Sequence, residues 1–250
     1  MILVCDIGNT RIKTGFYDGE NISHVQSFIN FEELYRIISE KEFSDCVFSS
    51  VVPEKSELLI KSVEGKTGKT PFRVIHNSKF NLKIEYQTPE TLGIDRICSA
   101  EGAYYLFNKI NKSYTDSDFI ISIDFGTATT LNFVKYPGIF PGGMILPGLN
   151  LMFNSLSQNT AQLPEVSEKD YTGITGADTK SSIAGGVINA QIGLIEKTIA
   201  DIKNGFNVSN VHIYLTGGNA EKIIPFLKFK YEYLRELVLI GIIAVYKNSN

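Results

Sequence analysis

Two runs of apolar residues, each ending in an aspartate, a glycine and small polar residues, stand out along the chain. Ile2–Thr10 reads ILVCDIGNT, and Ile120–Thr130 reads IISIDFGTATT. Each run predicts a buried β-strand that delivers an acid, Asp6 or Asp124, to a tight turn. The two acids lie 118 positions apart in a chain of 250 residues. A motif repeated at half-chain spacing predicts a duplicated protein with two lobes.

The hydrophobic pattern of the first half predicts a hairpin, followed by alternating helices and strands. Apolar and polar residues alternate over Arg11–Tyr17 and Asn21–Ile29 around the turn Asp18-Gly19, which is typical of a β-hairpin. Asn30 would cap the next helix, with Glu33 completing a capping box. The further elements predicted here are the helix Phe31–Glu40, the strand Asp45–Val51, the helix Glu54–Glu64, the strand Phe72–Ile75 and the helix Ile94–Phe107.

The second half repeats this plan. A serine, Ser181 or Ser182, is expected to start its longest helix, which Gly205 closes. The polar stretch Asn111–Asp118 is the predicted boundary, so the lobes would comprise residues 1–114 and 115–250. The pattern as a whole predicts an α/β fold. The predicted elements are strands at Ile120–Asp124 and Thr130–Tyr136, a third strand ending in Gly142–Gly148, the helices Leu149–Leu163 and Ile183–Asn204, the strand Val211–Leu215 and the helix Leu237–Tyr246.

Charge and cysteine content narrow the class of protein. Lys and Arg number 24 against 27 Asp and Glu, a formal net charge of −3, so we expect neither nucleic acid nor an anionic membrane as a partner. The three cysteines are far apart in apolar contexts, which favours reduced core thiols. No basic leader precedes the first strand, and the longest apolar run, Leu237–Tyr246, is too short to span a bilayer. A cytoplasmic location is expected.

The strongest candidates for chemistry are the two acids at the strand ends. Asp6 and Asp124 follow Ile, Val and Leu, where a carboxylate without a partner is costly. Each precedes a glycine and a hydroxyl residue, the composition of turns that bind phosphate or metal ions. Their alternative role is to cap a turn, but finding two such acids favours binding. The polar residues of the first hairpin, Asn9, Thr10, Arg11 and Lys13, fit either a phosphate loop or a merely solvated turn.

Other candidate motifs are weaker. Asp95, beside Arg96 at the start of a predicted helix, reads by itself as a carboxylate that favours the helix dipole. The run GKTGKT at residues 65–70 lacks the glycine spacing of a P-loop and indicates a solvated turn. His24, His76 and His212 share no motif with a cysteine or serine, so neither a triad nor a metal cluster is predicted. The glycine-rich turns at residues 142–148 and 216–218 suit a nucleotide cleft, or are plain tight turns.

Seven segments together resemble the type III pantothenate kinases, in order and spacing, from Met1 to the final helix. They are DIGNTRIK at 6–13, YQTPETLGIDR at 86–96, DFGTATT at 124–130, GGMILPG at 142–148, QLP at 162–164, GADT at 176–179 and TGGNA at 216–220. The resemblance implies two ribonuclease-H-like lobes, the duplicated actin-like ATPase fold of the acetate and sugar kinase, Hsp70 and actin superfamily. ATP would bind in the cleft between the lobes, and pantothenate would become 4′-phosphopantothenate, the first step of coenzyme A biosynthesis.

The resemblance also implies roles for individual residues. Asp95 would be the catalytic base, Asp6 would lie near the Mg²⁺ of the nucleotide, and Asp124 would hold a monovalent cation, K⁺ or NH₄⁺. ATP would contact the first loop and one residue of the second, namely Asp6, Ile7, Gly8, Asn9, Thr10, Arg11, Ile12, Lys13 and Thr127. Pantothenate would contact Tyr86, Gly93, Ile94, Asp95, Arg96 and Thr179. Ile94 departs from the alanine usual in this loop, so it would either narrow the pocket or pack toward the core.

The family further implies a homodimer whose second subunit helps to close the pantothenate pocket. Two alternatives to this function stay open at this point. One is another small-molecule kinase of the superfamily, against which the Tyr86–Arg96 segment argues. The other is a non-catalytic regulatory relative that acts as a transcription accessory factor, against which the joint presence of Asp6, Asp95 and Asp124 argues.

Overall fold

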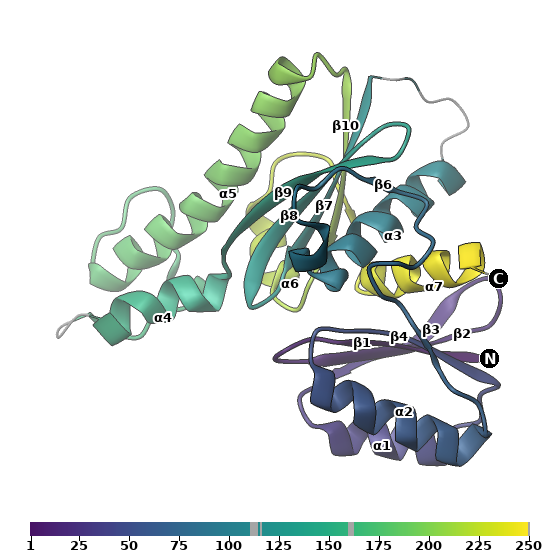
Figure 1. The fold of residues 1–250 in the computed structure, drawn as a ribbon. Coiled ribbons are helices and arrows are strands. Elements are labelled where there is room, and N and C mark those ends of the chain that lie inside the picture. The colour runs from purple at the N-terminus through teal and green to yellow at the C-terminus, as the bar shows by residue number, and fades with distance from the viewer. Residues whose placement is uncertain (111–114, 116, 160–162, 250) are drawn as a thin grey trace.

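The computed structural model describes residues 1–110, 115, 117–159 and 163–249, and it contains two mixed β-sheets (Figure 1). The first sheet has the strand order β3-β2-β1-β4-β5. Its first three strands form an antiparallel meander, and the last two add in parallel on the other side of β1. These strands are β1 (Ile2–Ile7), β2 (Ile12–Tyr17), β3 (Ile22–Phe28), β4 (Asp45–Ser50) and β5 (Phe72–Arg73).

The second sheet repeats this plan and adds one edge strand. Its order is β11-β10-β7-β8-β9-β6, again with an antiparallel meander, β7 to β9, and with β10 and β11 parallel to β7. The duplication seen in the sequence is therefore a duplication of topology, and the α/β prediction with two lobes is confirmed. The strands are β6 (Lys83–Ile84), β7 (Asp118–Phe125), β8 (Ala128–Lys135), β9 (Ile139–Pro147), β10 (Asn210–Thr216) and β11 (Glu232–Tyr233).

Two helices cover the outer face of the first sheet, α1 (Phe31–Glu40) and α2 (Pro53–Thr67) (Figure 1). The predicted inward stripe of α1 is confirmed, because Leu34, Ile37 and Ile38 are buried in the core beneath the sheet. The predicted capping box is wrong, since the side chain of Asn30 makes no capping hydrogen bond. The acidic residues in the first turn of α1 still interact favourably with the positive end of the helix dipole.

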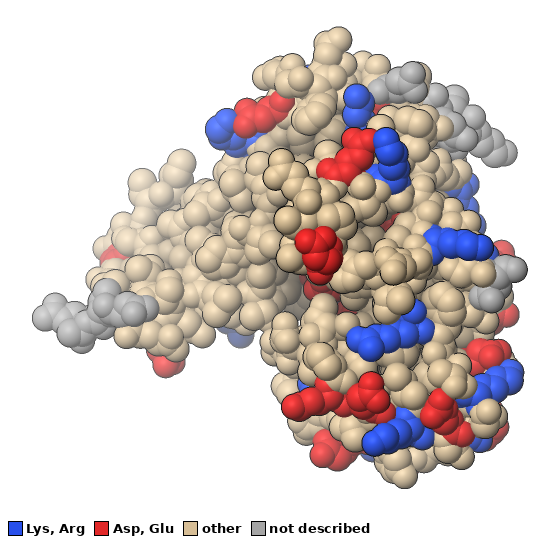
Figure 2. Space-filling view, viewed as in Figure 1, with Lys and Arg blue, Asp and Glu red and all other residues tan. Residues whose placement is uncertain are grey.

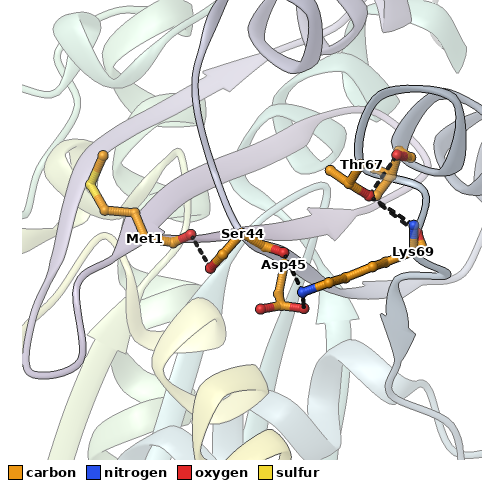
Figure 3. A network of polar contacts seen from close by, with 6 residues as sticks. Met1, Ser44, Asp45, Thr67 and Lys69 are labelled. Carbon is orange, nitrogen blue, oxygen red and sulfur yellow. Dashed lines mark hydrogen bonds and ion pairs between the residues drawn. The ribbon is translucent and has the colours of Figure 1, made fainter.

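The end of α2 explains the sequence GKTGKT. The helix runs through this segment to Thr67, and Gly68 ends it in the left-handed conformation, with φ at 69°. Lys69 Nζ then lies 3.1 Å from Asp45 Oδ1 and also contacts the carbonyl of Ser44, whose hydroxyl donates to Met1 O (Figure 3). These contacts fasten the turn to the start of β4. The prediction of a turn holds for residues 68–70 only, since residues 65–67 belong to α2.

Two helices, α3 (Ile94–Ile110) and α7 (Leu237–Ser249), pack against each other between the two sheets (Figure 1). Their backbones touch where glycines replace side chains. A Cβ at Gly102 would lie 2.2 Å from Leu237 O, and one at Gly241 would lie 1.8 Å from Cys98 O. Only glycine allows so close an approach. Residues of both sheets join these helices in one core cluster, for example Val4 of β1 and Ile120 of β7.

Helices α4 (Leu149–Asn159) and α5 (Thr179–Gly205) extend away from the second sheet on the left in Figure 1. The long helix begins at Thr179, earlier than predicted, because Asp178 is its N-cap and accepts a hydrogen bond from Ser181 N. Helix α4 is described to Asn159, and residues 160–162, within the longer predicted helix, lie outside the described residues. The remaining helices are short: α6 (Ala220–Ile223), η1 (Pro89–Thr91), η2 (Glu168–Asp170) and η3 (Ile224–Phe226).

The two halves of the sequence are interleaved in space. Strand β6, from the first half, pairs in parallel with β9 of the second sheet. Helix α7, from the end of the chain, contacts β1 and β4 of the first sheet. The predicted boundary at residues 111–118 falls largely outside the described residues, so the division after residue 114 stays a prediction.

Charges of both signs are mixed over the face seen in Figure 2, without a large area of one sign on the first-sheet side. Within the described residues, every helix is too short or too polar to cross a bilayer.

Candidate active site

The two acid-and-glycine loops are built alike. Asp6 pairs across the sheet with Ser49 of β4, whose hydroxyl donates to Asp6 Oδ1 at 2.7 Å. Gly8 N then donates to Arg11 O at 3.0 Å and closes the first loop. In the second loop, Gly126 N donates to Ala128 O at 3.1 Å. Each loop thus projects an acid from the end of a strand and turns back into the next strand.

These loops face each other, and two further glycine motifs support the second one. The hydroxyls of Thr10 and Thr127 lie 3.0 Å apart, which joins the loops directly. Gly148 N donates to Thr127 O at 3.0 Å. Gly217, with φ at 101°, lies so close that a Cβ there would come within 2.5 Å of Asp124 Oδ1. The glycine motifs that suggested a nucleotide cleft therefore meet around Asp124.

Negative charge accumulates at this meeting point. Burial raises the pKa of Asp6 to about 6, helped by the negative charges of Asp95 and Asp124, while the Ser49 hydrogen bond and Lys13 act in the opposite direction. Burial also raises the pKa of Asp124, against the influence of Lys13 and with that of Asp95. The negative charges of Asp95 and Asp124 thus act on Asp6, and that of Asp95 also acts on Asp124, which suits a site that receives cations.

Lys13 is more central than its sequence position suggested. It pairs with Asp6 across β1 and β2, and its Nζ donates to Arg235 O at 2.8 Å, just before α7. Its positive charge lowers the pKa values of both Asp6 and Asp124. The pairing of Lys13 with Asp6 could be predicted from the sequence, because the predicted hairpin places the two residues opposite each other. The influence on Asp124 depends on how the two lobes meet, which the sequence pattern does not contain.

Asp95 lies at the beginning of α3, where its Oδ1 accepts a hydrogen bond from Arg96 N at 2.9 Å. A Cβ at Gly93 would come within 2.5 Å of the same oxygen, so the glycine leaves room for the carboxylate. Ile94 is only 5% exposed and belongs to the core cluster between the sheets. Of the two possibilities for Ile94, packing toward the core is the one observed.

The glycine pair of β9 brings Tyr86 and Arg96 together. A Cβ on Gly142 would meet the Tyr86 ring at 3.4 Å, and one on Gly143 would meet Arg96 Nη2 at 3.0 Å. Gly142 has φ at 133°, a conformation that other residues rarely adopt. Two residues expected at the substrate therefore lie over adjacent glycines. This convergence was not visible in the sequence, because it depends on the placement of β9 beneath α3.

The other expected ligand residues divide into three groups. Ile7 and Ile12 have side chains fully buried in the first core, so they offer only backbone groups to a ligand. Asn9, Thr10, Arg11 and Thr127 have exposed side chains. Thr179 is exposed at the first position of α5, beside a cavity of about 500 Å³ lined also by Lys169, Asp178 and Lys180.

One chain does not bring Thr179 to Asp95. Figure 1 shows the beginning of α5 beside α4 on the left, well apart from α3. The other residues expected at the substrate lie in the segment that leads to α3 or on α3 itself.

The histidines have structural partners, as predicted, in two cases. His76 Nε2 lies 2.8 Å from Leu92 O, and His212 Nε2 lies 2.8 Å from Asp118 Oδ1. Among the described residues, no group of three or more His, Cys, Asp or Glu side chains is arranged to hold a metal ion by itself.

Comparisons with known proteins agree with the geometry. The family model described as type III pantothenate kinase matches residues 2–201. A type III pantothenate kinase from Persephonella marina is 33% identical, covering 98% of each chain. Another, from Thermosipho africanus, is also 33% identical and covers 99% of each.

Solved structures show the same fold at lower sequence identity. A putative Baf family transcriptional activator from Campylobacter jejuni has a TM-score of 0.62 at 19% identity, covering 98% of this chain and 97% of that one. A putative N-acetylmannosamine kinase from Listeria monocytogenes has a TM-score of 0.53 at 15% identity, covering 100% and 99%.

Proposed function

Since the chain belongs to the type III pantothenate kinase family, it is a kinase that phosphorylates pantothenate with ATP in coenzyme A biosynthesis, and we propose that Asp95 is its catalytic base. The observation that supports this assignment is electrostatic. The negative charge of Asp95 raises the pKa values of both Asp6 and Asp124, the acids of the two expected phosphate loops. A base for phosphoryl transfer has to lie beside the phosphates that it serves.

The reaction needs positioning more than covalent chemistry. In our proposal the Asp95 carboxylate accepts the proton of the primary hydroxyl of pantothenate as that oxygen bonds to the γ-phosphorus of ATP. The bond from that phosphorus to the bridging oxygen breaks, and ADP leaves with the electron pair. Tyr86 and Arg96 orient pantothenate, so that its hydroxyl faces Asp95 rather than water. The phosphates of ATP lie along the first loop, residues 6–13, and against Thr127.

Two cations fit the donor groups of the loops. Asp6 would face the Mg²⁺ that accompanies ATP, and Asp124 would hold K⁺ or NH₄⁺. Carboxylate oxygen is a ligand type that such hard cations take. Burial, and after it the negative charges of Asp95 and Asp124, raise the pKa of Asp6 to about 6 although Lys13 acts in the opposite direction, so a cation would stabilise the ionised carboxylate. Bound there, the cations would offset the charge of the phosphates, while the side chains of this chain bind and orient the substrates.

The working unit in this proposal is a homodimer. Thr179 is expected at pantothenate, yet it belongs to α5, which extends away from α3 in the single chain (Figure 1). A second copy related by two-fold symmetry would let α5 of one chain serve the pocket of the other. A surface that bears exposed apolar side chains near α4, Ile145 and Leu151, supports such a contact.

We also propose a cytoplasmic location, supported by three free and buried cysteines, as expected for a reducing compartment. The alternative of a transcription accessory factor is not favoured. The transcriptional activator from Campylobacter jejuni shares the fold at 19% identity, whereas relatives at 33% identity are named as kinases.

The function is tested by ADP release from ATP with and without pantothenate. Pantothenate-dependent release with a 1:1 yield of phosphorylated product supports the kinase. Release that is independent of pantothenate, or that requires a different alcohol, would show that the substrate assignment is wrong.

A further inference from the structure

The guanidinium of Arg96 is buried without a charged partner. Arg96 is only 7% exposed, and among the described residues no carboxylate lies within ion-pair distance of its side chain. Its Nη2 is buried and has no hydrogen-bond acceptor. Leaving a buried donor of a charged group unsatisfied is costly, so such a group is expected to meet an acceptor when the site is filled.

The side chain that holds the guanidinium is Asn132 of β8. Arg96 Nε donates to Asn132 Oδ1 at 2.9 Å. Asn132 is itself fully buried. Because an arginine nitrogen can only donate, the amide has to turn its oxygen toward Arg96 and its nitrogen away.

The other side of the amide is fixed by a chain of hydroxyls. Asn132 Nδ2 lies 3.3 Å from Ser122 Oγ and 3.4 Å from Thr130 Oγ1, and Ser122 lies 3.0 Å from Ser99 Oγ. This network connects β7, β8 and α3 beneath the site. Asn132 therefore has one available orientation, and the plane of the Arg96 guanidinium is set by it.

The unsatisfied nitrogen lies beside the glycine pair of β9, close to Tyr86, the other residue expected at the substrate. Arg96 Nη2 lies over Gly143, and the ring of Tyr86 packs over the neighbouring Gly142. A side chain at Gly143 would come within 3.0 Å of Nη2 and within 1.9 Å of Leu131 O. Because residue 143 is a glycine, no side chain of β9 occupies the space next to Arg96 Nη2.

We propose that Asn132 is a positioning residue that holds the Arg96 guanidinium with its Nη2 directed at an anionic or carbonyl oxygen of the substrate. The inference rests on the proposed function of Arg96 at pantothenate. It adds the residue that determines where the guanidinium lies. Asn132 acts through Arg96 and does not touch the reacting atoms.

The test first compares the steady-state kinetics of three single variants with those of the wild type. Asn132→Ser keeps a hydroxyl for Ser122 but is too short to reach Arg96, and it should raise KM for pantothenate about 10- to 100-fold, with KM for ATP within about twofold. Asn132→Asp keeps an acceptor oxygen and should restore most of the pantothenate affinity. Ser99→Ala removes a hydroxyl that contacts Ser122 but neither Asn132 nor Arg96. It is the control and should leave both KM values within about twofold, because Ser122 and Thr130 still hold the amide nitrogen.

A double-mutant cycle, which adds Arg96→Ala and the double variant Arg96→Ala/Asn132→Ser, separates positioning from general destabilisation. In the Arg96→Ala background, Asn132→Ser should change KM for pantothenate by less than about twofold, because the partner through which it acts is gone. An equal effect in both backgrounds would overturn the proposal, as would an unchanged pantothenate KM in a folded Asn132→Ser protein. If Asn132→Ser does not fold, the Asp variant decides, since a KM raised as much as in Arg96→Ala would contradict positioning by an acceptor oxygen. A wild type inactive on pantothenate would instead refute the proposed function.

Discussion

The hydroxyls of Thr10 and Thr127 lie 3.0 Å apart although 117 positions separate them in the chain. They belong to equivalent loops of the two sheets, so the contact joins the two copies of the repeat at the point where phosphates are expected. A ligand oxygen bound beside this pair could accept a hydrogen bond from the hydroxyl of either loop. A ligand bound there would therefore contact both lobes at once.

Replacing Asp95 with asparagine should lower kcat by roughly 10²- to 10⁴-fold, because the amide cannot accept the substrate proton. Asparagine keeps the oxygen that accepts from Arg96 N, at 2.9 Å in the wild type, so the start of α3 should persist. Melting temperature and kcat are measured on the same preparations. A folded Asp95→Asn enzyme with near-normal turnover would assign the base elsewhere.

Asp6→Asn should weaken the use of Mg²⁺ with ATP, since a neutral amide is a poorer ligand for a hard cation than a carboxylate. The Ser49 hydroxyl, 2.7 Å from Asp6 Oδ1, can still donate to the remaining oxygen. A titration of Mg²⁺ at fixed ATP should show a half-saturation shifted at least several-fold upward. Superimposable Mg²⁺ curves for the two proteins would leave Asp6 with a purely structural role.

The pH dependence of stability should differ between the wild type and the Asp6→Asn variant. The pKa of Asp6 is raised from 3.8 to about 6, so the native state binds this proton more tightly than the unfolded chain does. The free energy of unfolding therefore decreases as the pH rises from about 4 to about 6, because the protonated Asp6 is lost. Above about pH 6 the native state bears the full cost of the buried, charged carboxylate. Asp6→Asn should melt higher than the wild type at about pH 8, and the difference should shrink toward pH 4. A constant difference across this range would contradict the raised pKa.

Activity should rise with K⁺ at constant ionic strength, and Asp124→Ala should lose this response. In our proposal the phosphates of ATP add negative charge beside Asp6, Asp95 and Asp124. Lys13 offsets only part of the effects that raise the pKa values of Asp6 and Asp124, so a further cation would stabilise the filled site. Sodium and a bulky organic cation serve as controls, because they separate specific binding from screening. Equal turnover in K⁺ and in the bulky cation would indicate that Lys13 alone supplies the needed charge.

Two inactive variants should restore activity when mixed, if the site is shared between subunits. In a heterodimer of Asp95→Asn and Thr179→Arg chains, one pocket carries both changes and the other carries neither. Random exchange of subunits should then recover about a quarter of the wild-type turnover. Gel filtration confirms that each variant is dimeric beforehand. Mixtures that stay inactive after exchange, or a fully active monomer, would contradict the shared pocket.

The elements of the fold that local sequence patterns specify could be predicted, and those that depend on tertiary packing could not. The strands that end in Asp6 and Asp124 were predictable because apolar runs before an acid and a glycine have few other readings. Strand β6 was not, since two residues, Lys83–Ile84, show no alternation and pair only through the placement of β9. The start of α5 was predicted too late because Asp178 competes with Ser181 as the cap, and Ser181 instead donates its backbone N–H to Asp178.

The candidate site was predictable only in part, for a related reason. Asp95 looked like an ordinary helix-capping acid, and the resemblance to a family, rather than its own sequence context, suggested catalysis. Asn132 gave no signal at all, because one buried amide in a strand has no pattern until its partner, Arg96, is placed opposite it. Relations between distant segments, such as Tyr86 over Gly142, are properties of packing and have no local signature.

The glycine crossing between α3 and α7 has a consequence for how the enzyme can vary. Helix α3 carries Asp95 and Arg96 at its beginning, and its depth between the sheets is set where Gly102 meets Leu237 O and Gly241 meets Cys98 O. Even one methyl group at either position would force the helices apart and shift the end of α3 that carries Asp95. The position of the proposed base thus depends on two residues that have no functional group, so a substitution at this crossing would disturb the site without removing any side chain from it.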